Sequence, residues 1–222
     1  GYAILTVPER LVESVAGLEE IEYVEKPKRY FYQETDPVSD SCIVRVTGRD
    51  LLLSGEGVLI AVLDSGIDYR LPEFRRADGS TRIRYLWDQT LPAEEAELSG
   101  EQIDEILRRE QQGEWQGTLP GMDTSGHGTA VAAIAAGAVG AGGATGAAYR
   151  GVAQGAELLI VKLGQPDERS FPRTTQIMRG VTWALRKADS LQMPLVINLS
   201  FGNSYGAHDG SSLIERFLDN AA

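Results

Sequence analysis

Two side chains in this sequence have the type and setting that proton-transfer chemistry needs, and the first is Asp64. Its carboxylate directly follows the continuous apolar run 58–63, which is typical of a parallel strand buried on both faces. Because the carboxyl ends of parallel strands form the functional edge of such sheets, Asp64 is a candidate site residue. Four roles are open to it: orienting a histidine, accepting a phosphoryl group, binding a metal or capping a turn. Gly66 disfavours the phosphoryl acceptor, which usually has a second carboxylate two residues further on.

The second side chain is His127, which lies between Gly126 and Gly128 and precedes a run of small residues that ends at Gly137. Histidine titrates near neutral pH, so an unobstructed imidazole suits general acid–base catalysis. A lone histidine at the start of a helix is equally compatible with a structural role. The other histidine of the sequence, His208, lies in a polar segment and is assigned no role.

The surrounding pattern predicts a doubly wound α/β fold with a mostly parallel sheet. Apolar runs at 58–63, 157–161 and 195–199 predict buried strands, and a helix with one apolar face is expected over 174–190. Ser212 and Glu215 have the spacing of a capping box for a final helix. The region 75–120 departs from this rhythm. We interpret it as a surface insertion with an amphipathic helix at 101–111, or alternatively as a flap beside the site.

The first 33 residues predict a separate β-α-β piece. Residues 3–7 and 21–25 have strand-like patterns, and 8–17 has helical spacing. A piece of this size is too small to be stable alone, so we expect it to pack on the rest of the chain. The polar, proline-containing segment 34–41 is typical of an exposed linker.

Composition excludes several classes of function. The formal net charge of -11 counts against a nucleic-acid binder and against a basic membrane-surface protein. A single cysteine, Cys42, excludes an internal disulfide framework, and with only two histidines the sequence argues against cysteine- or histidine-rich metal sites. The longest stretch without Asp, Glu, Lys or Arg, 124–149, is mostly Gly and Ala and therefore too weakly apolar for a bilayer.

The two candidate segments together resemble a known family. Ala61-Val62-Leu63-Asp64-Ser65-Gly66-Ile67, followed by Gly126-His127-Gly128-Thr129-Ala130-Val131-Ala132, is similar to the Asp and His motifs of the subtilisin-like serine proteases, and in the same order. The segment 151–163 looks like the strand after the family's His helix, and 196–202 looks like its substrate-binding strand. The resemblance covers about 55–75 and 120–220.

The resemblance implies a serine endopeptidase with an Asp-His-Ser triad. His127 would be the general base, and Asp64 would fix its tautomer and stabilise the imidazolium. Ser200, Phe201 and Gly202 would offer backbone groups to an extended peptide substrate. Leu163 and Gly164 would line the opposite edge of the cleft.

The N-terminal residues resemble a propeptide of the same family. Residues 18–25 are similar to the closing half of subtilisin propeptides, and 28–33 would be the tail that runs through the active site. This implies self-cleavage between Gln33 and Glu34 and a division into a propeptide (1–33), a linker (34–54) and a peptidase part (55–222). The tail, the spacing and the segment 82–89 look most like the clostridial Csp-type germination proteases.

The sequence departs from the family pattern at the nucleophile. The family's Gly-Thr-Ser segment and the Ala-Gly-Asn motif of the oxyanion donor are not found in these 222 residues. We therefore expect both to lie in a remaining C-terminal part of the peptidase domain, and we expect this chain alone to be inactive, because removing the nucleophile costs about 10⁶ in kcat. No cofactor is expected. The segment 137–148 lacks carboxylate and amide ligands, so calcium is not supported at the loop after His127, although Glu73 leaves a carboxylate available for calcium elsewhere.

Three functions remain open at this point. The first is the endopeptidase, whose partners would be a polypeptide substrate and its own propeptide. The second is an inactive pseudoprotease of the same fold that acts as a binding or regulatory module. The third, a small-molecule phosphatase built around Asp64, would require magnesium-dependent hydrolysis of a phosphate ester.

Overall fold

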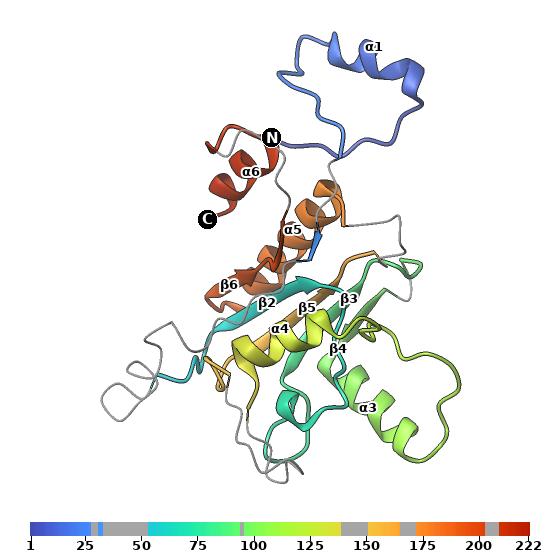
Figure 1. The fold of residues 1–222 in the computed structure, drawn as a ribbon, viewed down its shortest axis with the longest axis vertical. Helices are drawn as coiled ribbons and strands as arrows, with labels where there is room; N and C mark the ends of the chain where they lie inside the picture. The colour runs from blue at the N-terminus through green and yellow to red at the C-terminus, as the bar shows by residue number, and fades with distance from the viewer. Residues whose placement is uncertain (28–30, 33–52, 94–95, 139–150, 165–171, 203–208) are drawn as a thin grey trace.

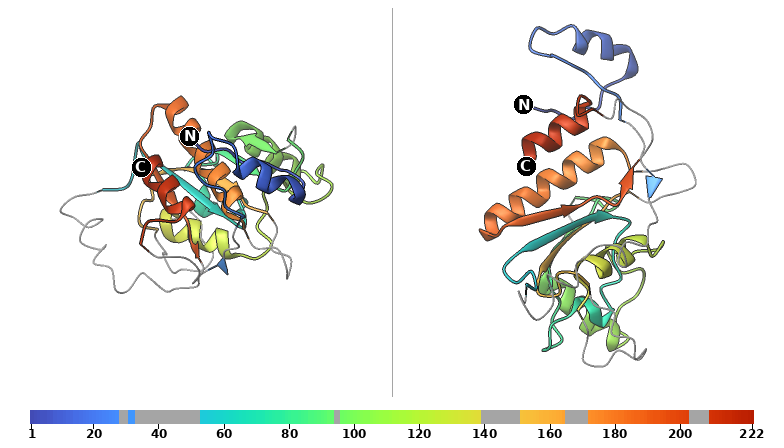
Figure 2. Two further views of the ribbon diagram at one scale, coloured as in Figure 1. Left: turned by 90° about the horizontal axis from the view of Figure 1, so that it is seen from above. Right: turned by 60° about the vertical axis from the view of Figure 1, so that its left-hand side comes forward.

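A computed structural model describes residues 1–27, 31–32, 53–93, 96–138, 151–164, 172–202 and 209–222. A five-stranded sheet forms the middle layer, and helices cover both of its faces (Figure 1). The right-hand view of Figure 2 shows α5 and α6 on one side of the sheet and α4 on the other. The prediction of a doubly wound α/β fold is confirmed.

The sheet has the strand order β4-β3-β5-β2-β6. Strands β3, β5, β2 and β6 are parallel, and β4 pairs antiparallel with β3 at one edge. The strands are β2 (Leu59–Asp64), β3 (Ile83–Asp88), β4 (Glu97–Ser99), β5 (Glu157–Lys162) and β6 (Leu195–Asn198).

Every residue of β2 is buried, because helices cover the sheet on both sides. Successive side chains of a strand point to opposite faces, and β2 follows this rule. Ile60 and Val62 belong to a core that includes α4 (His127–Ala136) and α3 (Gly100–Gln111), while Leu59, Ala61 and Leu63 belong to a second core under α5 (Thr174–Leu191) and α6 (Leu213–Ala221). The apolar run that predicted this strand therefore reflects two separate cores.

The amphipathic helices form as their sequence predicts. In α3, Ile103, Ile106 and Leu107 are buried, and Ser99 and Gln102 form a capping box. A second capping box joins Ser212 and Glu215 at the start of α6. The box satisfies backbone N–H groups that the first turn of a helix leaves without intrahelical partners, so both helices begin directly after the capping serine.

The structure corrects the interpretation of 75–120 as a surface insertion. A short 3-10 helix, η2 (Pro72–Phe74), leads into β3, which lies inside the sheet next to β5. Arg84 and Asp88 interrupt the apolar residues of β3, and only part of the strand is buried. A search for continuous apolar runs therefore missed this strand. Residues 97–111 continue as β4 and α3.

The N-terminal residues form the predicted helix, as η1 (Glu9–Leu11) and α1 (Val12–Ala16), but not the predicted flanking strands. Segments 3–7 and 21–25 pair with no strand among the described residues. A strand requires a neighbour for its backbone hydrogen bonds, and the alternating pattern alone does not supply one. In Figure 1, α1 stands apart from the sheet layers.

Contacts at two places join the described N-terminal residues to the rest of the chain, near β7 and at α6. Strand β1 (Phe31–Tyr32) pairs antiparallel with β7 (Phe201–Gly202), with Phe31 opposite Gly202 and Tyr32 opposite Phe201. At the other end of this part, the ring centroids of Tyr2 and of Phe217 in α6 lie 5.4 Å apart in a T-shaped arrangement, and Asn220 donates a hydrogen bond to the Tyr2 hydroxyl at 2.6 Å.

Candidate active site

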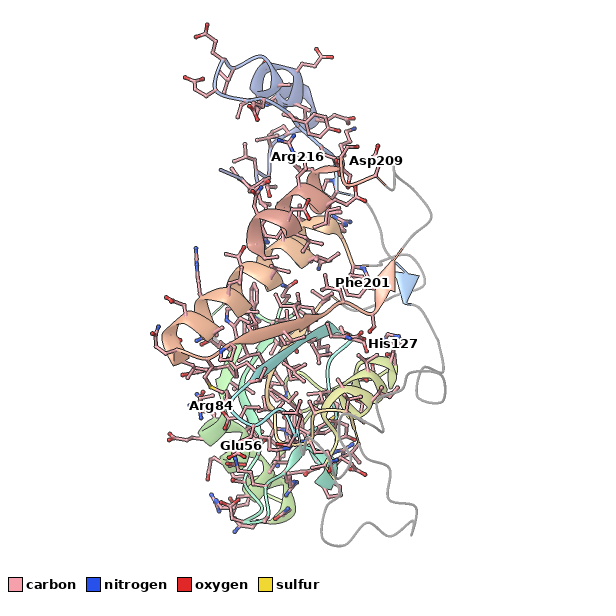
Figure 3. All side chains as sticks on the ribbon, turned by 90° about the vertical axis from the view of Figure 1, so that its left-hand side faces the viewer. Glu56, Arg84, His127, Phe201, Asp209 and Arg216 are labelled. Atoms are coloured by element: carbon pink, nitrogen blue, oxygen red, sulfur yellow. The ribbon has the colours of Figure 1, made fainter. Side chains whose placement is uncertain are left out.

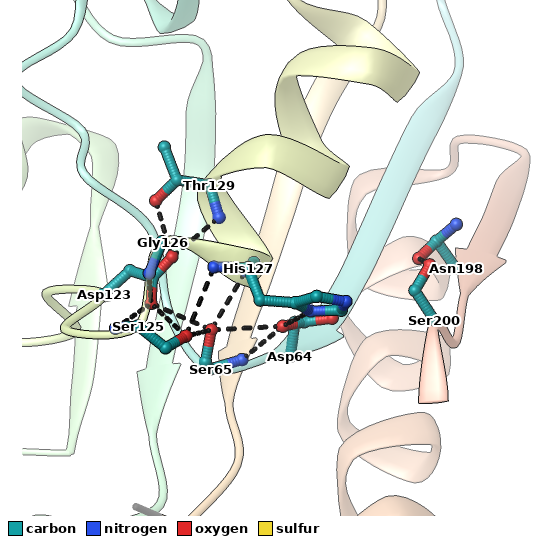
Figure 4. Close-up of polar contacts among 10 residues, drawn as sticks. Asp64, Ser65, Asp123, Ser125, Gly126, His127, Thr129, Asn198 and Ser200 are labelled. Carbon is teal, nitrogen blue, oxygen red and sulfur yellow. Dashed lines mark hydrogen bonds and ion pairs between the residues drawn. The ribbon is translucent and has the colours of Figure 1, made fainter. Parts of the chain in front are cut away.

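Asp64 and His127 meet at the carboxyl edge of the sheet. Asp64 is the last residue of β2, and His127 is the first residue of α4. The Nδ1 atom of His127 lies 2.7 Å from Oδ1 of Asp64 (Figure 4), and the two side chains are 14% and 1% exposed, respectively. Residues 63 positions apart are thus in hydrogen-bond contact, and the ring is the more accessible of the two.

Glycines on both sides of His127 allow this approach. Gly126 has φ of 84°, a left-handed conformation that favours glycine, and it turns the chain directly into the helix. Gly128 packs against the end of β2 so closely that a Cβ there would lie 2.3 Å from the carbonyl oxygen of Gly66 and 3.0 Å from Oδ1 of Asp64. A side chain at position 128 would push α4, and His127 with it, away from Asp64.

Burial dominates the electrostatics of Asp64. It raises the pKa of this carboxyl, although the hydrogen bond from His127 and those from the Ser65 backbone and hydroxyl work in the opposite direction. All of these contacts go to Oδ1, while Oδ2 is buried and accepts no hydrogen bond from the described residues. A partly compensated carboxylate of this kind can stabilise a positive charge on the neighbouring imidazole.

A second carboxylate, Asp123, organises the chain that leads into α4. Its Oδ1 accepts hydrogen bonds from the backbone N–H groups of Ser125 and Gly126, and its Oδ2 accepts from the N–H and hydroxyl of Thr129. Burial opposes the charged form of Asp123, but the hydrogen bonds from Thr129, Ser65 and Gly126 outweigh it and lower the pKa. Asp123 is therefore an ionised cap at the start of the helix that carries His127.

A buried lysine holds the loop in front of Asp123. Lys162 ends β5 beside Asp64, and its Nζ donates to the carbonyl of Met122 at 2.9 Å and lies 3.7 Å from Oδ2 of Asp88. That oxygen of Asp88 also accepts from the N–H of Gly121. The ends of β3 and β5 thus fix the loop before α4.

Four further residues of the site were not predicted from the sequence: Ser65, Asp88, Asp123 and Lys162. A signal for Asp123 was present, because an Asp followed by Thr, Ser and Gly ahead of a helix is a typical capping pattern. The pairing of Asp88 with Lys162 carried no such signal, because the two residues come from strands that are adjacent only in the folded sheet.

The predicted peptide-binding residues lie beside Asp64 and His127. Strand β6 is parallel to β2, with Asn198 opposite Val62, so the chain beyond Asn198 passes the level of Asp64. Figure 4 shows Ser200 and Asn198 to the side of the imidazole, with the Ser200 hydroxyl donating to Oδ1 of Asn198 at 2.7 Å. Figure 3 shows Phe201 and His127 at the same edge of the molecule. The Phe201 side chain is 8% exposed, so the backbone of β7 is the part that offers a binding edge.

The structure corrects one predicted contact and leaves others outside the described residues. Leu163 is fully buried in the core under α5, so its side chain does not line a cleft. Gly164 follows it and is half-buried, near the side-chain amide of Gln176. The predicted cleavage residues, Gln33 and Glu34, lie outside the described residues, as does most of the segment 137–148.

Two features are absent from the described residues. They contain no group of three or more His, Cys, Asp or Glu side chains placed to hold a metal ion. None of the helices in that same part of the chain has the length and apolar character needed to cross a membrane.

Comparison with protein families gives two matches on separate parts of the chain. The model of the subtilase family matches residues 55–221, which include both Asp64 and His127. The model of the Csp protease B prodomain matches residues 1–28.

Solved structures agree with these matches. The CspB protease of Clostridium perfringens is 35% identical, with a TM-score of 0.68 over 81% of this chain and 36% of its own. The S41 psychrophilic protease is 25% identical, with a TM-score of 0.52 over 81% of this chain and 47% of its own. Sphericase, at 22% identity with the same TM-score and coverage, shares the fold. The chain therefore spans about a third of the length of the CspB protease and less than half of the other two.

Proposed function

The chain belongs to the subtilase family of serine proteases and carries a prodomain of the Csp protease B type, and from this we propose that it contributes the acid and base of a peptide-cleaving triad. Asp64 and His127 are the proposed catalytic residues. The nucleophilic serine and the oxyanion-binding Asn are proposed to come from a part of the protein outside these 222 residues. The contact of 2.7 Å between the two side chains carries this proposal.

The geometry suits general-base catalysis. A hydrogen on Nδ1, donated to Asp64, fixes the tautomer whose lone pair lies on Nε2. In the proposed reaction Nε2 takes the proton of the serine hydroxyl while the serine oxygen attacks the peptide carbonyl. The buried Asp64 carboxylate stabilises the imidazolium, which then gives the proton to the leaving amine. Water then attacks the acyl-enzyme while Nε2 takes its proton, and the imidazolium returns that proton to the serine oxygen as the acid product leaves.

The substrate is proposed to add a strand to β7. The edge of β7 already pairs antiparallel with Phe31–Tyr32, which lie just before Gln33, the residue on the N-terminal side of the predicted cleavage bond. An extended polypeptide bound in the same way would pass the candidate catalytic residues in one direction and one register. This pairing supports the interpretation of residues 28–33 as a propeptide tail that lies where a substrate would lie.

The fluorophosphonate reaction tests the triad, because such probes label only a serine that a neighbouring base has activated. The full-length protein is expected to be labelled, and His127→Ala is expected to abolish labelling while Arg84→Ala, a substitution at the far end of the sheet, leaves it intact. A folded full-length protein that is not labelled would contradict the endopeptidase. It would favour the alternative, a pseudoprotease of the same fold that binds peptides or a partner.

Self-cleavage between Gln33 and Glu34 is a separate part of the proposal. N-terminal sequencing of the purified full-length protein is expected to find a new N-terminus at Glu34 or within a residue or two of it, and to find none in His127→Ala. A labelled protein in which Gly1 remains joined to Thr35 would contradict self-processing and leave the triad standing.

A further inference from the structure

The hydroxyl of Ser65 touches both carboxylates of the site. Ser65 follows Asp64 in the chain and is 3% exposed. Its Oγ lies 3.1 Å from Oδ1 of Asp64 and 2.9 Å from Oδ1 of Asp123. It also accepts the backbone N–H of Gly128, the residue after His127, at 2.9 Å. One small side chain therefore joins the end of β2 to the start of α4 (Figure 4).

The Ser65 hydroxyl can donate only one hydrogen bond at a time. A serine has one hydroxyl hydrogen, and an ionised carboxylate has none, so Ser65 donates to Asp64 or to Asp123 but not to both at once. The hydroxyl of Ser125, 2.9 Å from Ser65 and 3.0 Å from Oδ1 of Asp123, adds one more hydrogen. When Ser125 donates to Asp123, the Ser65 hydrogen is available to Asp64. The backbone N–H of His127 in turn points to the Ser125 hydroxyl at 3.2 Å.

We propose that Ser65 is a positioning residue for the reaction, and that it holds Asp64 against His127 by binding the Asp64 carboxylate, Asp123 and the N-terminal turn of α4 together. This inference rests on the proposed function of Asp64 and His127. Ser65 is buried and acts through the carboxylate of Asp64 and the start of α4. It acts by fixing the carboxylate in the orientation that receives the Nδ1 hydrogen, and by donating to the same oxygen.

The Ser65 hydroxyl and the Asp123 carboxylate have opposite effects on the imidazole. The hydrogen bond that Ser65 donates to Asp64 stabilises the ionised carboxylate. It therefore reduces the stabilisation that this carboxylate gives to a protonated His127. The anionic Asp123 favours a protonated His127 by its charge. Ser65→Ala is therefore expected to raise the pKa of His127, and Asp123→Asn is expected to lower it. The other charged side chains on the elements around α4 are unchanged in both variants: Asp68, Glu73, Arg82, Asp88 and Lys162.

The test measures the His127 pKa directly in the full-length protein by NMR titration of ¹³C-labelled histidine. These 222 residues contain only one further histidine, His208, which serves as an internal reference for this part of the protein. The expected result is an upward shift in Ser65→Ala and a downward shift in Asp123→Asn. Ser99→Ala, which removes a capping serine from the exposed start of α3, is the matched control and is expected to leave the titration unchanged.

Turnover provides the second readout. Ser65→Ala is expected to lower kcat about tenfold, the size of one hydrogen bond to a charged group, with KM within a factor of about two. Ser65→Thr, which keeps a hydroxyl at this position, is expected to retain most of the parent kcat. If Ser65→Ala does not fold, Ser65→Cys, which keeps the volume and donates only weakly, is expected to shift the titration in the same direction.

The outcomes separate this inference from the proposed function. A His127 pKa that Ser65→Ala and Asp123→Asn leave unchanged, or shift in the same direction, would overturn the role of Ser65 whether or not the protein cleaves peptides. Opposite shifts in a protein that fluorophosphonate does not label would support the positioning and refute the peptidase.

Discussion

At the scale of single residues, the charge on Asp64 is opposed by burial and favoured by the imidazole beside it. Burial prevails, because the pKa of this carboxyl is raised above its ordinary value. A group with a higher pKa in the folded state binds protons more readily when folded, so ionising it costs stability as the pH rises through that pKa. The ionised form of Asp64 therefore lowers the stability of the fold.

This gives a prediction for Asp64→Asn. The variant keeps the side-chain shape and removes the buried charge, so its free energy of unfolding at pH 7 is expected to equal or exceed that of the parent. The stability that the parent loses between acidic and neutral pH through Asp64 is expected to be absent in the variant. Its kcat is expected to fall by about 10⁴, as when the carboxylate of such a triad is neutralised. Chemical denaturation at several pH values and peptidase assays of the full-length protein measure both effects.

Asp123→Asn is the matched comparison for stability. The pKa of Asp123 is lowered in the folded state, so its charge contributes stability above its ordinary pKa, and that contribution is lost as the pH falls below about 4. This variant is expected to be less stable than the parent at neutral pH. An Asp64→Asn protein that is destabilised as strongly as Asp123→Asn would show that the Asp64 charge has a structural role.

At the scale of elements, the position of α4 on β2 decides whether the two candidate catalytic residues meet. The helix packs through glycine and alanine, with Gly128, Ala132 and Ala136 buried against the sheet. Small residues let the backbones approach closely, which a helix with larger side chains on this face could not do. The accumulation of Gly and Ala after His127 is therefore a requirement of the site's geometry.

Gly128→Ala tests this packing. The new Cβ would meet backbone and Asp64 atoms that cannot move aside, so the substitution is expected to destabilise the fold by about 3 kcal/mol and to abolish fluorophosphonate labelling. Gly180→Ala in α5 is the control, because its Cβ would meet the side chains of Leu63 and Val161, which can adjust. Thermal melting and probe labelling of both variants distinguish the two cases. Equal effects would show that close approach at position 128 is not required.

The opposite end of α4 depends on one buried arginine. Arg82 donates to the carbonyls of Gln154, Ala156 and Glu73, and also to that of Ala136 at the end of α4. Burial, and the nearby Arg76, lower the pKa of this guanidinium. Its charge lies where the negative end of the helix dipole favours a cation.

Arg82→Met is expected to destabilise the fold by about 3 kcal/mol, because it leaves buried carbonyl groups without donors while preserving the apolar stem. Arg84→Met is the matched control: Arg84 is 41% exposed and pairs with Glu157, so its replacement is expected to cost less than about 1 kcal/mol. The free energies of unfolding of the two variants give the comparison. A small loss in Arg82→Met would mean that water replaces the guanidinium.

At the scale of the whole molecule, residues from both ends of the chain lie together. Tyr2 contacts Phe217 and Asn220 in α6, and the side chain of Ile4 packs on the same core. Strand β1 contacts β7, which lies far along the sequence, next to the candidate active site. The residues matched by the prodomain model are therefore held to the peptidase part at α6, and Phe31–Tyr32, which follow them, pair with β7.

Tyr2→Ala is expected to weaken the attachment at α6. It removes a ring contact and a hydrogen-bond acceptor, and the expected cost is about 1–2 kcal/mol. Faster hydrogen exchange confined to α6 and residues 1–5 is the predicted signature. Tyr23→Ala is the control, since Tyr23 is 62% exposed and its loss is expected to change neither region. Unchanged exchange at α6 in Tyr2→Ala would show that this contact does not hold the prodomain.

The sequence by itself determined the features that rest on local chemistry. Continuous apolar runs identified β2, β5 and β6, helical spacing identified α3 and α5, and Ser212 and Glu215 marked the start of α6. The expected burial of β6 was wrong, because the strand is only partly covered and Val196 is 55% exposed. The motifs around Asp64 and His127 indicated the family. These signals are readable because a strand buried on both faces, an amphipathic helix and a cap each impose their pattern on adjacent residues.

Only the tertiary structure decided which residues act on each other across the sheet. It placed β3 inside the sheet, left segments 3–7 and 21–25 without partner strands among the described residues, and buried Leu163 under α5. It also brought Ser65 to Asp123 and Lys162 to Asp88. Strand pairing and hydrogen bonds between distant residues depend on which elements become neighbours, and the energies that choose those neighbours are summed over the whole core rather than contained in any one segment.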